Sequence, residues 1–196
     1  MDRIDPETLT GAETSRHKRS MLAGRRYLAD DPLLVAERVR AHVLMERYNA
    51  TSIVAPDDRR RLLEALLGSV GERTEIRSPF HLDYGYPTSI GSRCFVNYGA
   101  TFLDCAAIEI GDDVQIASGV LLLTATHPLD ASERTAGWEC ALPITIGSEV
   151  WLGGGVIVCP GVSVGARTVV GAGAVVTRDL PADVVAVGNP ARILER

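Results

Sequence analysis

A period of six residues runs through the chain from about residue 78 and restricts its fold more than any other feature. Large aliphatic or aromatic residues recur at every sixth position, with one two-residue slip and one interruption. They are Ile90, Val96, Phe102, Ile108, Ile110, Ile116, Leu122, Ile146, Leu152, Val158, Val164, Val170 and Val176. A small or β-branched residue stands four positions after most of them, and glycine often follows them directly. Ordinary alternating strands predict a period of two and give no reason for a glycine at every sixth residue.

A six-residue unit is too short to contain a helix and fits one short strand with a corner. Three units close a triangular coil of about 18 residues, in which the large residue points inward. Coils then stack at roughly 4.8 Å and pair their backbone groups with the coils above and below. We expect the recurrent glycine to supply the backbone angles of the corners. The period therefore predicts a mainly β chain, a parallel β-helix of four to five coils.

The chain divides into three parts. Residues 1–73 have helical patterns at 14–23, at 30–49 and at 56–68, where Asp30–Asp31–Pro32 marks the start of the second helix. We expect these residues to form a small N-terminal helical cap. Residues 74–182 form the β-helix, with an extended loop at 124–143, and residues 183–196 form a C-terminal capping tail. The cap and the tail are expected to cover the coil ends, because open sheet edges promote aggregation.

Charge and targeting signals narrow the function. Residues 1–73 carry 13 Lys/Arg and 12 Asp/Glu, so residues 74–196 carry 7 and 13, a net charge of −6 that disfavours nucleic-acid binding. The arginines at 59, 60 and 61 are interpreted as one solvated helix face. No apolar run approaches the roughly 20 residues that span a bilayer, and residues 1–20 do not resemble a secretory signal. We therefore predict a cytoplasmic protein without membrane or nucleic-acid partners.

The cysteines form no CxxC pair and no regular spacing, and they are interpreted as free, mostly buried thiols. They are Cys94, Cys105, Cys140 and Cys159.

The interruption of the period is the best candidate for chemistry. Between Leu123 and Ile144 the six-residue register fails over about twenty residues, and long excursions from a rigid scaffold are usually functional or disordered. This segment contains His127, followed by Pro128. An imidazole titrates near neutral pH and can act as a general base. His17 and His42 are expected on the surface of the helical part, and His81 at the first coil is expected to be structural or exposed.

Several segments resemble the maltose/galactoside/nodulation acetyltransferases of the hexapeptide-repeat superfamily. In the β-helix and tail they are Thr124-Ala-Thr-His-Pro-Leu-Asp130, Asp83-Tyr-Gly-Tyr86, Asn97, Pro143-Ile-Thr-Ile-Gly147, Val150-Trp-Leu-Gly-Gly154 and Val187-Gly-Asn-Pro-Ala-Arg192. In the helical part they are Met21-Leu-Ala-Gly-Arg-Arg-Tyr27 and Arg47-Tyr-Asn49. The similarity spans roughly residues 16–194.

This resemblance implies a left-handed parallel β-helix that assembles as a homotrimer, whereas the general crossover rule alone favours a right-handed connection. It implies that acetyl-CoA and a sugar acceptor bind in clefts between subunits. His127 is then the general base for direct acetyl transfer to a sugar hydroxyl, with no acyl-enzyme and no metal. Backbone amides at 153–154 are candidates for stabilising the oxyanion.

Further roles follow from the resemblance residue by residue. Asp83 and Asn97 match positions that hold the acceptor, and Asp30 lies one position beyond a matching carboxylate. The positions that match the coenzyme A groove are Gly154, Ala172, Thr177, Arg178 and Arg192. Cys105 stands where the galactoside enzyme has a carboxylate, which leaves a galactoside preference open. The sequence does not identify the acceptor or its reacting hydroxyl.

Three other functions are alternatives to a sugar acetyltransferase. A carbonic anhydrase of this fold requires three zinc-binding histidines, and the β-helical part holds only His81 and His127. A non-catalytic β-helix that binds partner proteins explains the period but leaves the His127–Pro128 loop and the tail motif without a role. An acetyltransferase for an antibiotic, an amine or serine keeps the chemistry and changes the acceptor.

Overall fold

The computed structural model describes residues 15–195, and its main body is a parallel β-helix with three faces. The first face contains β2 (Ser69–Val70), β5 (Thr88–Ile90), β8 (Ile108–Ile110), β13 (Ile144–Ile146) and β16 (Ser163–Val164). The second face contains β3 (Glu75–Ile76), β6 (Phe95–Val96), β9 (Gln115–Ile116), β14 (Trp151–Leu152), β17 (Val169–Val170), β19 (Val185–Val187) and β20 (Arg192–Ile193). The third face contains β4 (His81–Leu82), β7 (Thr101–Leu103), β10 (Leu121–Leu123), β15 (Ile157–Val158) and β18 (Val175–Val176).

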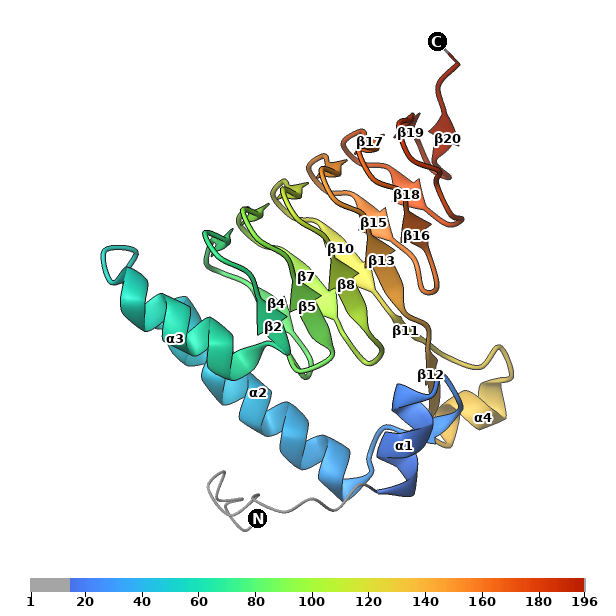
Figure 1. Cartoon of the computed structure of the whole chain (residues 1–196). Helices are drawn as coiled ribbons and strands as arrows, with labels where there is room; N and C mark the ends of the chain where they lie inside the picture. The colour runs from blue at the N-terminus through green and yellow to red at the C-terminus, as the bar shows by residue number, and fades with distance from the viewer. Residues whose placement is uncertain (1–14, 196) are drawn as a thin grey trace.

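Within the described residues the strands make five complete coils, as the predicted four to five allow, and a partial sixth (Figure 1). The first coil begins before residue 78, the expected start of the period, because Val70, Ile76 and Leu82 already follow the six-residue spacing. The change from helix to β-helix therefore comes at Ser69, five residues before the expected boundary. At the other end, β19 pairs in parallel with β17 and β20 folds back antiparallel to β19, so part of the expected tail continues the coil.

The core consists of one inward column of apolar side chains for each face. In the first face Ile90, Ile110, Ile146 and Val164 occupy consecutive coils in register, and each is at most 5% exposed. In the third face Phe102 also contacts Phe80 edge-on, with ring centroids 5.1 Å apart. The two-residue slip arises in the first face, where Ile108 and Ile110 of one strand are both buried. The predicted inward positions of the hexads are thus the core of the structure.

The recurrent glycines are required for close packing of coils, not for corner angles as the sequence analysis proposed. Of the glycines that directly follow a core residue, Gly147 and Gly153 are representative, and neither has a positive φ. A Cβ at Gly147 would lie 2.6 Å from the backbone nitrogen of Ala166 in the next coil. A Cβ at Gly153 would lie 2.6 Å from the backbone nitrogen of Ala172. A side chain here would push stacked coils apart.

Replacing Gly153 by alanine is therefore expected to lower stability by roughly 1–3 kcal/mol, the usual cost of overpacking. The adjacent Gly154 is the matched control, because its Cβ would meet nothing closer than the Ser118 carbonyl oxygen at 3.6 Å. Gly154→Ala is expected to change stability by less than about 0.5 kcal/mol. Denaturant unfolding of both variants measures the difference. Equal losses in the two variants would contradict this role of close packing.

The three corners of the coil differ in chemistry. The corner between the first and second faces, here the charged corner, has positive φ at Arg73, Arg93, Asp113, Glu149, Arg167 and Asp183. The corner between the second and third faces, here the glycine corner, has positive φ at Gly99, Gly119, Gly155, Gly173 and Gly188. The corner between the third and first faces carries residues 124–143 and is here the loop corner.

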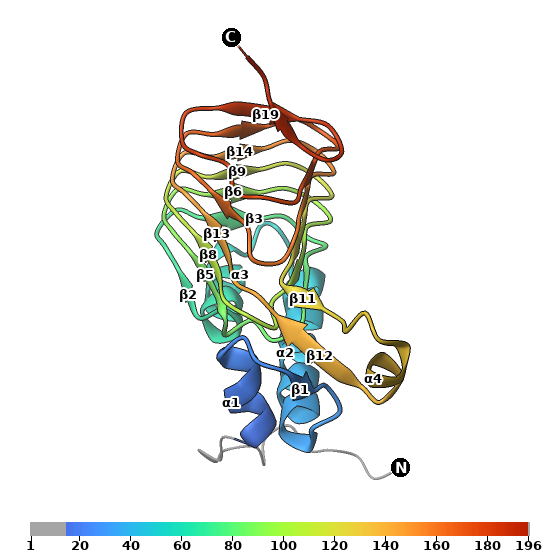
Figure 2. The same cartoon turned by 90° about the vertical axis from the view of Figure 1, so that its right-hand side faces the viewer.

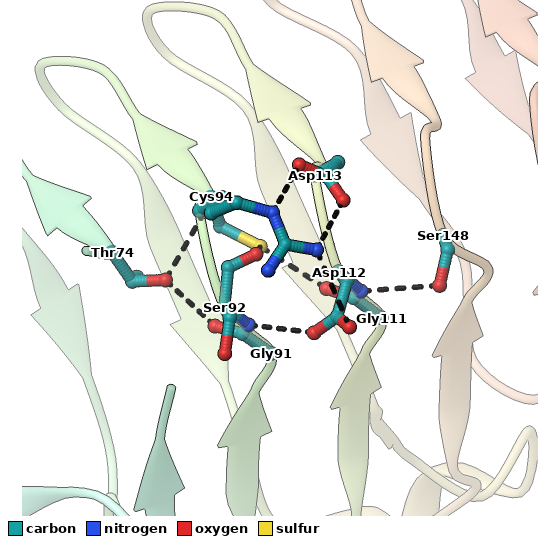
Figure 3. Close-up of polar contacts among 9 residues, drawn as sticks. Thr74, Gly91, Ser92, Cys94, Gly111, Asp112, Asp113 and Ser148 are labelled. Carbon is teal, nitrogen blue, oxygen red and sulfur yellow. Dashed lines mark hydrogen bonds and ion pairs between the residues drawn. The ribbon is translucent and has the colours of Figure 1, made fainter. Parts of the chain in front are cut away.

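Ion pairs and buried hydrogen bonds connect neighbouring coils at the charged corner. Arg93 forms two hydrogen bonds with Asp113, at 2.7 and 2.6 Å. Beneath them the Cys94 thiol donates to the Gly111 carbonyl oxygen at 3.0 Å, and Thr74 donates to the carbonyl oxygen of Gly91 at 2.6 Å (Figure 3). All four cysteines are free; Cys94 and Cys105 are buried, and Cys140 and Cys159 are partly buried.

The helical cap contains α1 (Arg16–Leu22), β1 (Tyr27–Leu28), α2 (Pro32–Ala50) and α3 (Pro56–Leu66). The predicted start of the first helix at Thr14 lies outside the described residues. Asp31 caps α2 by accepting from the backbone N–H groups of Leu33 and Leu34. α2 and α3 pack at the first-coil end of the β-helix (Figure 1). There the Asn49 side chain donates to the carbonyl of Phe80 and accepts from its N–H.

Two of the three consecutive arginines on α3 bind the first coil, so their interpretation as a solvated face was wrong. Arg59 donates to the carbonyl oxygen of Ile76 and to the hydroxyl of Tyr48. Arg60 donates to the carbonyl oxygens of Val70 and Gly71, both at 2.7 Å. The first coil has no coil beneath it, and the guanidinium groups occupy carbonyls at that open edge. Arg61 alone is largely exposed, in an ion pair with Asp58.

The interruption folds into an antiparallel sheet that the N-terminal part completes. β11 (Ala125–Thr126) pairs with β12 (Trp138–Ala141), and β12 pairs in turn with β1 of the cap. α4 (Ala131–Thr135) lies between the two loop strands. Figure 2 shows this sheet projecting from the β-helix next to α1. The cap therefore holds the loop as well as covering the first coil. Within residues 15–195 no helix is both long and apolar enough to cross a membrane.

Candidate active site

His127 lies on the projecting loop, directly after β11, and its side chain is exposed. The root of this loop is fixed by the buried Thr124. The Thr124 hydroxyl donates to the carbonyl oxygen of Leu103 at 2.5 Å and accepts from the N–H of Ala106 at 3.0 Å. The Thr124 carbonyl oxygen accepts from the N–H of Leu142 at 2.9 Å, which ties the two ends of the loop together. An exposed imidazole on an anchored loop is available to a substrate in a defined position.

Asp83 lies at the same corner as His127, in the turn that follows β4. Its half-buried carboxylate is 3.6 Å from the Cys105 thiol of the next coil. Burial raises the pKa of Asp83, while the thiol and the charges of Arg38 and His42 act in the opposite direction. Arg38 and His42 come from α2, so the cap supplies positive charge beside this carboxylate.

Further polar side chains surround Asp83 and were not identified from the sequence. Tyr27 of β1 is fully buried, and its hydroxyl donates to Glu139 of β12 at 2.8 Å. Arg38 donates to the hydroxyl of Tyr84 at 3.4 Å. We call the whole group the polar cluster; its members are Tyr27, Arg38, Asp83, Tyr84, Cys105 and Glu139. Carboxylate, hydroxyl and guanidinium groups together can bind a polar molecule through several hydrogen bonds.

The Cys105 thiol is not suited to nucleophilic catalysis. Burial, followed by the charge of Asp83, raises the pKa of Cys105 to about 12. The reactive form of cysteine is the thiolate, and a thiol with this pKa is almost entirely protonated at neutral pH. In the polar cluster Cys105 therefore acts as a hydrogen-bond donor to Asp83.

The raised pKa of Asp83 leads to a prediction about stability. Between the ordinary and the raised pKa the folded chain binds more protons than the unfolded chain, so stability falls as pH rises through this range. Asp83→Asn removes the charge that burial disfavours. We therefore expect the variant to unfold at a higher temperature than the native chain at pH 7, with the gain shrinking toward pH 3–4, where Asp83 is protonated in both states. Thermal unfolding across this pH range measures the effect. A gain that is independent of pH would contradict it.

Three of the other predicted site residues lie at the glycine corner. Asn97 follows β6, and Gly154 and Ala172 follow β14 and β17. The N–H of Gly173 donates to the carbonyl of Gly154 at 2.8 Å, so Gly154 and Ala172 belong to one stacked ridge. Gly154 is half-buried and Ala172 is exposed. A ridge without large side chains leaves its backbone accessible to a ligand.

One chain does not bring all the predicted residues together. Leu82 pairs with Phe102, which puts Asp83 level with Leu103, six residues beyond Asn97. Asn97 precedes β7 at the glycine corner and Asp83 follows β4 at the loop corner, so the two acceptor candidates lie at opposite ends of the third face. Thr177 and Arg178 follow β18 at the loop corner and are exposed, while Arg192 is exposed on β20. Asp30 is exposed in the turn between β1 and α2, next to the capping Asp31.

Among the described residues, no three His, Cys, Asp or Glu side chains are grouped so that they could hold a metal ion.

Comparison with known proteins identifies the fold and the general reaction. Residues 20–71 match the model described as maltose acetyltransferase hexapeptide capping motif. Residues 143–178 match bacterial transferase hexapeptide (six repeats), and residues 87–124 match hexapeptide repeat of succinyl-transferase. Nodulation protein L of Rhizobium meliloti is 43% identical over 180 residues, which cover 92% of this chain and 98% of the relative.

Solved structures agree. A maltose O-acetyltransferase from Clostridium difficile is 42% identical with a TM-score of 0.90, over 94% of this chain and 98% of that one. A galactoside acetyltransferase in complex with coenzyme A is 33% identical with a TM-score of 0.89, over 93% and 91%. The predicted parallel β-helix of hexapeptide repeats is confirmed. The chain is an acetyltransferase and belongs to the maltose/galactoside/nodulation group of the hexapeptide-repeat superfamily.

Proposed function

We propose that this acetyltransferase moves the acetyl group of acetyl-CoA directly to a hydroxyl of a sugar, with His127 as the general base. The observation that carries the proposal is the exposed imidazole of His127 on an anchored loop at the same corner as the polar cluster. The match to acetyltransferases, two of them named for maltose and galactoside substrates, supports the reaction and the sugar class.

The reaction moves one proton in two transfers through His127 and needs no covalent enzyme intermediate. Neutral His127 takes the proton of the acceptor hydroxyl as its oxygen attacks the thioester carbonyl. The tetrahedral intermediate then collapses, the carbon–sulfur bond breaks, and the proton passes from the imidazolium to the leaving thiolate. A base placed in this way contributes roughly 10²–10⁴-fold to the rate. The protonated state of Cys105 favours this direct route over an acyl-enzyme.

We propose that acetyl-CoA lies between two copies of the chain in a homotrimer. The glycine corner of one copy would supply Asn97, Gly154 and Ala172, and the loop corner of its neighbour would supply His127 and the polar cluster. The third face joins these corners, and its outward side chains are largely apolar. They include Leu103, Leu121, Leu123, Ile157 and Val175, each half-buried in the single chain. An apolar face of this kind favours self-association.

The cationic residues supply the remaining contacts. Arg178 and Arg192 are exposed and suited to the phosphates of coenzyme A through charge-assisted hydrogen bonds, with Thr177 next to Arg178. On the acceptor side, Asp83 would accept hydrogen bonds from sugar hydroxyls. Asp30 is assigned to the outer edge of the acceptor site.

The test is release of free coenzyme A thiol from acetyl-CoA in the presence of a panel of acceptors. The panel contains maltose, glucose, galactosides and chitooligosaccharides, together with serine, simple amines and an aminoglycoside antibiotic. We expect thiol release to depend on a sugar, and the product to be an O-acetyl ester that mild base removes. Preference for an amine or for serine would replace the sugar with that acceptor class.

A further inference from the structure

Buried polar side chains are concentrated at the loop corner. Among the described residues, and apart from tyrosines and cysteines, four polar or charged side chains are fully buried: Thr88, Asp104, Thr124 and Thr168. The first three lie at the loop corner, and Thr168 lies at the charged corner. Burying a polar group is costly unless it is hydrogen-bonded, so this concentration requires a local reason.

Asp104 makes the largest set of these contacts. Its Oδ1 accepts from the N–H groups of Asp83 at 3.1 Å and Tyr84 at 2.8 Å. Its Oδ2 accepts from the N–H of Gly85 and from the hydroxyl of Thr88, both at 2.8 Å. Four donors thus converge on a carboxylate that is 0% exposed. Three of them are consecutive backbone amides of the turn that carries the Asp83 side chain.

The turn is shaped closely around these contacts. Gly85 has a φ of +79°, and a Cβ there would lie 2.1 Å from the carbonyl oxygen of Leu66. The next coil continues the arrangement, because Leu103 pairs with Leu123 and thereby puts Asp104 level with Thr124. Thr124 is the residue that fixes the root of the His127 loop. Asp104 therefore lies between the turn of Asp83 and the loop of His127.

Burial raises the pKa of the Asp104 carboxyl, and the hydrogen bonds from Tyr84, Thr88 and Gly85 oppose that change, while the charge of Asp83 adds to it. An ionised carboxylate is the species that can accept all four hydrogen bonds at once. Asparagine has the same shape, but its amide nitrogen cannot accept from a backbone N–H.

We propose that Asp104 is a positioning residue for the acceptor: its carboxylate holds the turn at 83–85 and so fixes the position of Asp83 in the polar cluster. Asp104 itself does not reach the substrate. The proposal rests on the proposed function, in which Asp83 binds the sugar.

The first experiment measures the turn directly and needs no activity. Amide hydrogen exchange is compared between the native chain and Asp104→Asn. We expect faster exchange at Tyr84 and Gly85 by at least about tenfold, with little change at core amides of distant coils such as Val170. Thr168→Val is the matched control, because it removes an equally buried hydrogen bond, from the Thr168 hydroxyl to Pro181, at another corner. Unchanged exchange at Tyr84 and Gly85 in Asp104→Asn would overturn the proposal.

The second experiment measures the acceptor. In Asp104→Asn we expect the KM for the sugar to rise about tenfold, with the KM for acetyl-CoA and kcat changed less than about threefold. In an Asp83→Ala background the same substitution should have little further effect, because Asp104 acts through Asp83. Thr168→Val should leave both KM values unchanged. Equal rises in both KM values, or full additivity with Asp83→Ala, would overturn the proposal.

Thr88→Val covers the case in which Asp104→Asn does not fold, because it removes only one of the four donors. Thr88→Val should also speed amide exchange at Tyr84 and Gly85 and raise the sugar KM, but by less than Asp104→Asn. An unchanged sugar KM together with unchanged exchange would contradict the positioning role of Asp104. Failure of the proposed function is recognised separately. In that case the native chain transfers no acetyl group to any sugar, while the exchange result still reports on the turn.

Discussion

Replacement of His127 by alanine is expected to lower kcat for acetyl transfer by roughly 10²–10⁴-fold, the usual contribution of a positioned general base. The KM for acetyl-CoA should change little, because the imidazole acts on the acceptor proton. The folded state should also be preserved, since the side chain is exposed and the loop is held by Thr124 and by the pairing of β1 with β12. Steady-state kinetics with thermal unfolding measure all three quantities.

His81→Ala is the matched control, because His81 is also exposed at the third face but lies on β4 of the first coil. It should retain near-native kcat. His127→Asn adds a second control, since asparagine keeps hydrogen-bonding ability but cannot take up a proton near neutral pH. A His127→Ala variant with native kcat would remove this residue from the reaction.

Two variants that are inactive alone are expected to restore activity when they assemble together. His127→Ala damages the loop corner, and Ala172→Trp fills the ridge of the glycine corner at an exposed position that leaves the core intact. In a trimer that contains both kinds of chain, one junction joins the intact loop corner of one chain to the intact glycine corner of its neighbour. Such trimers should have about one third of native activity.

The mixed trimers are obtained by co-expressing the variants with different affinity tags and purifying on both tags. The control places both substitutions in one chain and pairs it with the native chain. A site contained within a single chain predicts no recovery from the two single variants. Recovery therefore separates a shared site from a self-contained one.

The β-helix was predictable because its physics is local and repetitive. Each hexad places one apolar residue inward, so Val96, Ile116 and Leu152 are recognised from spacing alone and are buried as expected. The same rule extends to Val70 and Ile76, which belong to a coil that begins before the expected start of the period. The reason for the glycines was not predictable in the same way, because it depends on how closely the next coil approaches.

The cap was harder to predict because its partner surface is formed by distant residues. Val39 and Val43 are spaced along the sequence as part of an apolar side of α2, yet both are exposed. The buried residues of α2 are Ala36 together with Leu34, Ala41 and Tyr48, which are spaced seven residues apart. Arg59 and Arg60 look like solvated charges until the open carbonyls of the first coil are known.

The candidate site was predictable where a motif marks it and not where contacts assemble it. His127 stands out as an imidazole in the interruption, and Asp83 follows from a family motif. Tyr27 and Glu139 are 112 residues apart and meet only because β1 pairs with β12. No spacing rule connects them, although Glu139 lies within the interruption and Tyr27 within a family-like segment.

The most direct test of the account is a crystal structure of the native chain with acetyl-CoA. The account predicts a trimer in which the cofactor lies along Gly154 and Ala172 of one chain, with its thioester within reach of His127 of the next. A monomer with acetyl-CoA held by residues of one chain, or a thioester carbon far from every His127, would contradict it.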